Sequence, residues 1–155
     1  MISAIPQGYQ SVTPYLCCRD ASQAIAFYAR ALGAKEIYRL RMPDGKIGHA
    51  ELQIGDCRIM LSDENPSWGN RSAKTLGGSP MTLRVYTQDV DALAASFVAA
   101  GGTEIMPLKD EFYGDRSGSF EDPEGYRWML GQHIEDVTPD EMSRRMKKLF
   151  ESKAG

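Results

Sequence analysis

The sequence of 155 residues repeats a pattern at a spacing of 69 positions, and this duplication constrains the fold more than any other feature. The matches follow one order along the chain: Thr13 with Thr82, Asp20 with Asp89, 33–37 with 101–105 at a spacing of 68, and 58–61 with 127–130. A one-residue deletion in the second half and a later insertion reconcile the two spacings. Collinear matches over about fifty residues indicate two copies of one structural module.

Each copy has the pattern of a strand, a helix and three further strands. Asp20 and Gln23 form a capping box for the first helix, which we expect to end at Gly33, and Asp89 is the equivalent cap in the second copy. The expected strands are 12–18, 36–42, 46–54 and 57–62 in the first copy, and 81–87, 103–106, 118–121 and 126–130 in the second. Pro107 is expected to end the strand at 103–106, because proline cannot donate to a ladder.

The repeat predicts a single domain over residues 1–155, divided into module one (about 11–62), a linker (63–79), module two (about 80–131) and a C-terminal helix (about 138–152). The linker is polar and rich in glycine, serine and asparagine. It is long for a simple connector, so it is either a solvated segment, a lid or a contact with a partner.

The C-terminal helix has a cap at Thr138, followed by Pro139 and Glu141. Its apolar residues share one face and are Met142, Met146, Leu149 and Phe150, whereas its basic residues lie mostly away from that face. We expect this helix to dock on the body of the protein or on a second subunit. Binding to a membrane surface is the alternative.

Composition excludes several classes of protein. The net charge of −3, from 18 basic and 21 acidic residues, argues against nucleic-acid binding. No apolar run approaches the roughly 18 residues that span a bilayer, and the N-terminus lacks the pattern of a signal peptide. The three cysteines, two of them adjacent, then indicate free thiols in a cytoplasmic protein. With only His49 and His133, a site of three imidazoles per subunit is excluded.

The duplicated module, with a helix opening at an aspartate and a late Asp-Pro-x-Gly turn at 122–125, resembles the vicinal oxygen chelate superfamily, which includes glyoxalase I, extradiol dioxygenases and bleomycin-resistance proteins. A closer resemblance, to the PhnB-like branch, lies in these segments: 15–16, 43–47 (PDGKI), 49–52 (HAEL), 112–116 (FYGDR) and 133–137 (HIEDV). The resemblance implies an α+β fold in which tandem βαβββ modules form a cup-shaped mixed sheet with outer helices, here followed by a C-terminal helix. It also implies a homodimer. Each cup would be completed either within one chain or by a swapped partner.

The metal enzymes of this superfamily take ligands from four strand positions, which correspond here to Thr13, Met60, Thr82 and Met129. None of these side chains is a credible ligand for a hard or borderline divalent ion, which prefers carboxylate or imidazole. We therefore predict no metal at the family positions and no cofactor. A divalent metal would require a site of another kind.

Strand alternation predicts which side chains share the cup face with those four positions. In module one they are Tyr15, Cys17, Arg58 and Ser62; in module two they are Arg84, Tyr86 and Arg127. Tyr113, Asp115 and Arg116 lie on a glycine-containing loop where pocket mouths are often found. The predicted ligand-binding residues are thus Thr13, Tyr15, Met60, Thr82, Arg84, Tyr86, Tyr113, Arg116 and Met129. The alternative is a cup collapsed around its methionines, with the arginines in solvent.

His49 and Glu51 are two residues apart on one expected strand, so their side chains project to one face. They are the candidate catalytic residues, either as an acid–base pair or within an alternative metal site. A cross-strand hydrogen-bonded pair is the structural alternative.

Three functions remain open. The first, which we favour, is binding or sequestration of a small organic molecule, anionic or aromatic, in the cup. The second is a lyase, isomerase or dioxygenase-type enzyme that uses His49 and Glu51. The third is a scaffold protein that uses its C-terminal helix.

Overall fold

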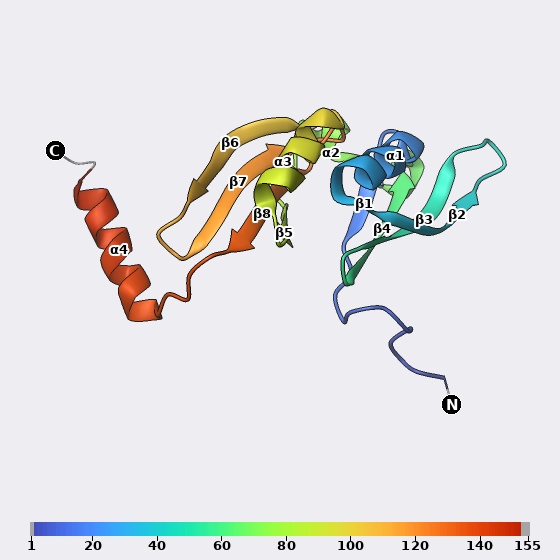
Figure 1. Cartoon of the computed structure of the whole chain (residues 1–155). Coiled ribbons are helices and arrows are strands. Elements are labelled where there is room, and N and C mark those ends of the chain that lie inside the picture. Colours follow the sequence, from blue (N-terminus) through green and yellow to red (C-terminus); the bar gives the residue numbers. More distant parts are fainter. Residues whose placement is uncertain (1, 153–155) are drawn as a thin grey trace.

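The computed structural model describes residues 2–152 and arranges them as two modules side by side, with a helix projecting from the second (Figure 1). Module one consists of β1 (Tyr15–Cys18), α1 (Ala21–Leu32), β2 (Lys35–Arg41), β3 (Ile47–Ile54) and β4 (Cys57–Asp63). Module two consists of β5 (Thr82–Tyr86), α3 (Val90–Ala99), β6 (Thr103–Asp110), β7 (Asp115–Glu121) and β8 (Arg127–His133). The C-terminal helix is α4 (Pro139–Glu151).

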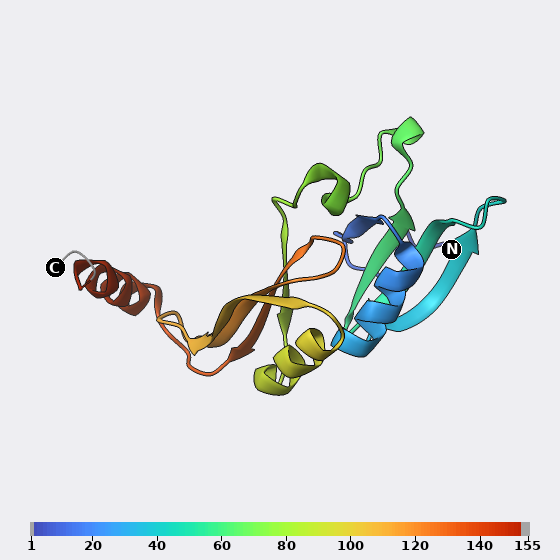
Figure 2. The same cartoon turned by 90° about the horizontal axis from the view of Figure 1, so that it is seen from above.

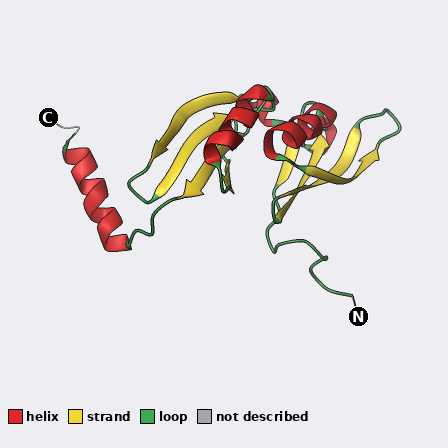
Figure 3. Cartoon of the chain, in the orientation of Figure 1, coloured by secondary structure: helices red, strands yellow, loops and turns green. Residues whose placement is uncertain are grey.

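Each module forms a four-stranded mixed sheet of the same topology. The strand orders are β1-β4-β3-β2 and β5-β8-β7-β6, with the β1–β4 and β5–β8 pairs parallel and the others antiparallel. Figure 3 shows one long helix lying against each sheet. The predicted α+β fold with tandem βαβββ modules is confirmed, and the eight strands belong to two separate sheets within the chain.

The duplication extends to the atoms that start the helices. Asp20 accepts a hydrogen bond from the Gln23 backbone N–H at 3.0 Å, and Asp89 accepts one from the Ala92 N–H at 2.9 Å. The two caps have nearly the same backbone angles, with φ −138° and −141° and ψ 92° in both. Gly33 ends α1 in the left-handed conformation, which glycine adopts without steric cost.

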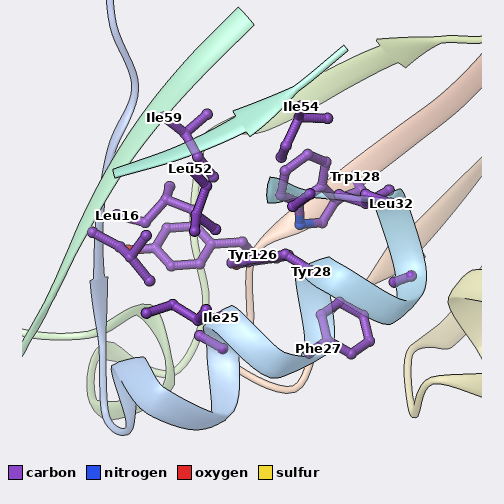
Figure 4. Close-up of a cluster of buried hydrophobic side chains, with 14 of the residues drawn as sticks. Leu16, Ile25, Phe27, Tyr28, Leu32, Leu52, Ile54, Ile59, Tyr126 and Trp128 are labelled. Carbon is purple, nitrogen blue, oxygen red and sulfur yellow. The ribbon is translucent and has the colours of Figure 1, made fainter. Parts of the chain in front are cut away.

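One face of each sheet supplies the hydrophobic core. Leu16, Ile59 and Leu61 of sheet one, and Trp128 and Leu130 of sheet two, are buried beneath the helices. Figure 4 shows Leu16 and Ile59 of module one and Trp128 of module two around α1. The strand alternation predicted from the sequence therefore separates a helix-facing from an outward-facing set of residues.

The two modules share this core because α1 and α3 pack on each other. Phe27 and Phe97 meet edge to face, with ring centroids 5.1 Å apart and an interplanar angle of 89°. The ring centroid of Tyr28, in α1, lies 5.5 Å from that of Trp128 in module two. Since both helices meet at the centre, the opposite faces of the two sheets turn away from the common core.

Asp122, in the turn between β7 and β8, fixes this arrangement through hydrogen bonds. Its carboxylate accepts from the Tyr28 hydroxyl at 2.7 Å and from the Trp128 indole N–H at 2.8 Å. The backbone N–H groups of Glu124 and Tyr126, both 2.9 Å away, bond the same carboxylate. Burial raises the pKa of Asp122, although these hydrogen bonds work against the rise. A buried carboxylate with four donors ties module one to module two.

One expectation about the strands needs correction. β6 continues through Pro107 to Asp110, because the β6–β7 register shifts between Met106 and Lys109 and no ladder bond is required of the proline nitrogen.

The linker between the modules has regular structure of its own. It contains a short 3₁₀ helix η1 (Pro66–Trp68) and a short helix α2 (Ala73–Leu76), in which Ala73 is buried. Among residues 2–152, no helix is long and apolar enough to cross a membrane.

We expect Asp122→Ala to lower the free energy of unfolding by about 3 kcal/mol, since each buried donor left without a partner costs about 1–3 kcal/mol. Urea unfolding followed by tryptophan fluorescence measures this loss. Asp140→Ala, at an exposed position of α4, is the control and should change stability by less than about 0.5 kcal/mol. A loss below about 1 kcal/mol for Asp122→Ala would show that the turn does not depend on its carboxylate.

Candidate functional site

The outward face of sheet one carries a polar cluster built around Glu51. This carboxylate is only 6% exposed, and it accepts hydrogen bonds from the hydroxyls of Tyr9 and Tyr38, the latter at 2.6 Å. Arg58 lies 3.7 Å from it and stacks over the Tyr9 ring, 4.7 Å from the centroid. The segment before β1 therefore folds over the sheet and contributes Tyr9 to the cluster.

His49 completes this cluster at the next outward-facing position of β3. Its Nε2 is 3.2 Å from the Glu51 carboxylate, and its Nδ1 is 2.9 Å from the Tyr15 hydroxyl. Tyr15 is paired with Met60 across the parallel β1–β4 ladder, and Glu51 is paired with Met60 on the other side. Sheet one thus presents a histidine between a tyrosine and a carboxylate, beside a methionine.

The outward face of sheet two carries a second cluster, built around Asp115 at the start of β7. Asp115 is 4% exposed, forms an ion pair with Arg84, and accepts a hydrogen bond from the Tyr86 hydroxyl at 2.9 Å. His133, on the neighbouring strand β8, lies 2.8 Å away through its Nδ1. One buried carboxylate therefore holds an arginine, a tyrosine and a histidine in place.

The contacts within this second cluster shift the pKa values of His133 and Asp115. Hydrogen bonds to Asp136 and Asp115 hold the pKa of His133 above its ordinary value. Burial acts to raise the pKa of Asp115, but the hydrogen bonds from His133 and Tyr86 and the charge of Arg84 outweigh burial and lower that pKa. His133 is accordingly favoured as a cation beside an ionised Asp115. A hollow of about 510 Å³ lies next to Tyr86 and His133.

The four family metal positions do not offer a metal-binding set in the structure. Met60 and Met129 lie on the outward faces, and the Arg84 guanidinium donates to the Met129 sulfur at 2.7 Å. A cation already occupies the space beside that thioether. Thr13 precedes β1, and Thr82 is the exposed first residue of β5. Within residues 2–152, no group of three or more histidine, cysteine, aspartate or glutamate side chains is arranged to hold a metal ion.

The structure brings most of the expected site residues together in two groups. Tyr15, Met60, His49 and Glu51 lie on sheet one, with Thr13 just before it; Thr82, Arg84, Tyr86, Tyr113 and Met129 belong to module two. Arg116 joins neither group, because it points to the helix side of β7 and pairs with Asp91 and Asp110. Cys17 and Ser62, expected on the open face, are buried.

Three members of these clusters were missed in the sequence: Tyr9, Tyr38 and His133. The β2–β3 ladder shifts register between Glu36 and Tyr38, so strand alternation does not reveal which β2 side chains reach Glu51. Tyr9 precedes any regular element. His133 was missed because the expected strands, 118–121 and 126–130, stop short of the cross-strand pair that Asp115 and His133 form in the structure.

Comparison with known proteins agrees with this architecture. The family model described as "Glyoxalase/Bleomycin resistance protein/Dioxygenase superfamily" matches residues 9–130. The uncharacterized protein Mb0911c of Mycobacterium bovis is 39% identical over 139 residues, which is 88% of this chain and 91% of that protein. TioX from Micromonospora sp. ML1 superposes with a TM-score of 0.64 at 25% identity, covering 81% of this chain and 99% of TioX. The PhnB protein from Bacillus cereus, at 19% identity, shares the fold with a TM-score of 0.62, over 79% and 99% of the two chains.

We expect the pKa of His133 to fall in both Asp136→Asn and Asp115→Asn, because each substitution removes a negative hydrogen-bond partner. Imidazole chemical shifts followed by NMR as a function of pH measure this change. Asp140→Asn, on α4, is the control and should leave the titration of His133 unchanged.

The same pair predicts a pH dependence of stability. Because the pKa of His133 is raised on folding, its contribution is complete below the unfolded value of about 6.5 and is lost as the pH rises through the folded value. Asp115→Asn should therefore lower the urea midpoint more at about pH 5 than at about pH 8.5. An equal loss at both pH values would contradict a charged His133–Asp115 pair.

Proposed function

Because the chain belongs to the Glyoxalase/Bleomycin resistance protein/Dioxygenase superfamily, we propose that it binds or sequesters a small organic molecule on the outward faces of its sheets. The observation that carries the proposal is that aromatic and thioether side chains lie open on both outward faces, although the tyrosines are not at positions related by the repeat. Tyr15 and Tyr86 are 49% and 58% exposed. Met60 and Met129 are half-buried beside them. Tyrosine offers flat stacking area with a polar tip, and methionine adapts to irregular ligands.

The binding cup is formed by two copies of the chain. Within one copy the outward faces of the two sheets turn away from the shared helical core, so they do not enclose a ligand together. The chain exposes 9671 Å², whereas a compact protein of 17.2 kDa exposes about 7,800 Å². The excess is more than the roughly 800 Å² that each partner buries in a typical stable interface. Sheet one of one copy facing sheet two of another buries this surface and creates two equivalent cups per homodimer.

The charge on the two faces favours an aromatic ligand over a simple inorganic anion. Arg84 stacks 4.7 Å from the Tyr86 ring centroid and is neutralised by Asp115, and Arg58 is similarly placed between Tyr9 and Glu51. An inorganic anion would have to displace these buried carboxylates. A flat organic molecule can stack on the tyrosines while an acidic group on it reaches the outer edge of a guanidinium.

A second candidate function is an acid–base enzyme. The contact between His49 and Glu51, and the Tyr15 hydroxyl on the other imidazole nitrogen, favour it, because a histidine oriented by a carboxylate is a common proton carrier. Glu51, however, already accepts from two tyrosine hydroxyls. In this arrangement the carboxylate orients His49, and His49 is the group that would exchange a proton with a substrate.

We expect mixed dimers to reveal a shared cup. Tyr15→Ala alters sheet one and Tyr86→Ala alters sheet two, and each variant alone should weaken binding of the aromatic anion 8-anilinonaphthalene-1-sulfonate by about tenfold, which is about 1.4 kcal/mol. In a heterodimer of the two variants, a shared cup leaves one site with both substitutions and one site intact. Titration calorimetry should then recover one wild-type site per dimer.

The design separates the possible arrangements. If each cup lies within one chain, every site of the heterodimer carries one substitution and no wild-type affinity returns. Homodimers of each single variant, purified in parallel, are the matched controls. A monomer by light scattering, or unchanged affinity in both single variants, would overturn the proposal.

Metal content distinguishes the binding protein from a metal enzyme that uses His49 and Glu51. We expect untagged protein, purified without added metal or chelator, to carry far less than one transition metal per chain, because methionine and threonine occupy the family ligand positions. Elemental mass spectrometry measures this ratio. About one metal per chain, lost in His49→Ala but retained in His133→Ala, would instead support the enzyme.

A further inference from the structure

The C-terminal helix α4 is a complete helix without a surface to pack on in the described chain. Thr138 caps it, with its hydroxyl accepting from the Glu141 N–H at 3.3 Å, and Pro139 occupies the first turn. None of its residues is buried. Isolated helices shorter than about 12–15 residues are marginal in water, and most helical stability comes from packing an amphipathic face. A helix of 13 residues therefore implies a partner surface.

Hydrogen bonds hold the N-terminal half of α4 and the segment before it against the rest of module two, so the fold sets the direction of the helix. Arg145 forms two hydrogen bonds to the Glu135 carboxylate, at 2.9 and 2.7 Å, and a third to the Phe112 carbonyl at 3.3 Å. The N–H groups of Ile134 and Glu135 both donate to the Gly114 carbonyl at 2.9 Å. Gly114 has φ +94° and sits so close to the Glu135 carbonyl that no Cβ fits there. The helix is an arm with a fixed base.

One side of this arm is apolar and exposed. Met146, Leu149 and Phe150 are exposed, Phe150 by 64%. Lys147 and Lys148 point to other sides of the helix, so they stay in water when the apolar side is covered. Figure 1 shows α4 projecting from the β6–β7 end of module two, away from both sheets.

An apolar surface in need of cover lies on β2, an edge strand of sheet one. Ile37, Tyr38 and Leu40 are exposed on this strand, Leu40 by 57%. Proteins commonly protect an exposed sheet edge by covering it with a helix. The β2 strand of the same chain is out of reach, because β2 and α4 lie at opposite ends of the molecule in both Figure 1 and Figure 2.

We propose that α4 of one copy packs its apolar side on β2 of a second copy, across the mouth of the shared cup. If β1 of one copy lies next to β5 of the other, the outermost strands of the cup are β6 and β2, the opposite edges of the two sheets. The arm α4 is held at the turn after β6 through the hydrogen bond from Arg145 to the Phe112 carbonyl, and its 13 residues give it a length of about 20 Å in which to reach toward the facing strand. This inference rests on the proposed shared cup, which it supplies with a cover made by the partner.

Several observations favour a second copy over other partners. The chain exposes more surface than a compact protein of its mass, and the apolar side chains of α4 and β2 are part of that surface, which a second copy would bury. The family match ends at residue 130, before α4 begins, so the arm lies outside the part of the chain that matches the family model. A membrane surface would instead require the lysines beside the apolar side to meet lipid headgroups, and it would leave β2 uncovered.

A disulfide trap tests the contact in the full chain. One copy carries Leu40→Cys and the other Phe150→Cys, both in a Cys57→Ser background; the remaining cysteines, Cys17 and Cys18, are buried. After subunit exchange and mild oxidation, we expect a cross-linked heterodimer on a non-reducing gel. Lys148→Cys, which places the thiol on another side of α4, is the matched control and should cross-link to Leu40→Cys at least about tenfold less.

The outcomes separate this contact from the shared cup itself. If Tyr15→Ala and Tyr86→Ala complement each other but the Leu40–Phe150 pair does not cross-link, the arm proposal fails and the shared cup stands. Efficient cross-linking by Phe150→Cys alone would show that two α4 helices pair with each other and would overturn the contact with β2. A monomeric wild type would overturn both.

A second variant tests the role of the cover. Phe150→Glu should raise the dissociation rate of 8-anilinonaphthalene-1-sulfonate by about tenfold, because the partner's arm no longer closes the cup, whereas Lys148→Glu should leave the rate unchanged. Stopped-flow fluorescence measures both rates. Equal rates in the wild type and Phe150→Glu, or binding to anionic phospholipid vesicles that Phe150→Glu abolishes, would overturn the proposed cover.

Discussion

The edge-to-face contact between Phe27 and Phe97 sets the geometry on which the rest of the molecule depends. It joins α1 to α3 at a ring distance of 5.1 Å and makes one core out of two modules that each have only half a core. Asp122 reinforces the junction by accepting hydrogen bonds from both Tyr28 and Trp128. Because the helices meet in the middle, the outward faces of the sheets are left open. The sheets expose their outward faces because their other faces are used to form the common core with α1 and α3.

Each open face is organised by a buried carboxylate. Glu51 collects Tyr9, Tyr38 and His49 on sheet one, and Asp115 collects the Arg84, Tyr86 and His133 side chains on sheet two. A buried carboxylate is costly unless it is fully hydrogen-bonded, and both are. The repeat does not relate the two clusters: the residues equivalent to Tyr15 and Met60 are Arg84 and Met129, whereas Glu51 and Asp115 occupy different positions along their strands. The backbone duplication has been kept while the chemistry of each face has diverged.

The sequence predicts what depends on local rules and misses what depends on packing between segments. Asp20, Asp89 and Gly33 start and end the helices where capping chemistry requires. Alternation correctly separated Ile59 and Leu61 from Met60 on β4, and Trp128 and Leu130 from Met129 on β8, because one side of each strand is buried. Pro107 was misjudged, because whether a strand tolerates proline depends on the register with its neighbour.

In the candidate site, too, the sequence predicts what local rules decide and misses what depends on contacts between distant segments. The sequence indicated that Tyr15, His49 and Glu51 share a face, since alternation alone decides that. It did not indicate that Tyr9 folds over Glu51, because that contact joins residues 42 positions apart through an irregular segment. The packing of the two modules on each other could not be predicted from the sequence either. Both arrangements of the cup satisfy the same periodicity, whereas the packing of α1 on α3, which turns the outward faces of one chain away from each other, depends on contacts far apart in the sequence.

The neutralised arginines connect this chemistry to recognition. Arg58 and Arg84 come from different strands, yet each stacks over a tyrosine at 4.7 Å and pairs with a buried carboxylate. A free arginine in a cup would bind any small anion, including abundant inorganic ones. An arginine held between a ring and a carboxylate keeps its flat face in place and has little net charge to offer, so a ligand must supply aromatic surface as well as charge. In the shared cup that we propose, one such group from each copy would face the same space, so selectivity would come from stacking on two sides and would depend on the two chains staying together.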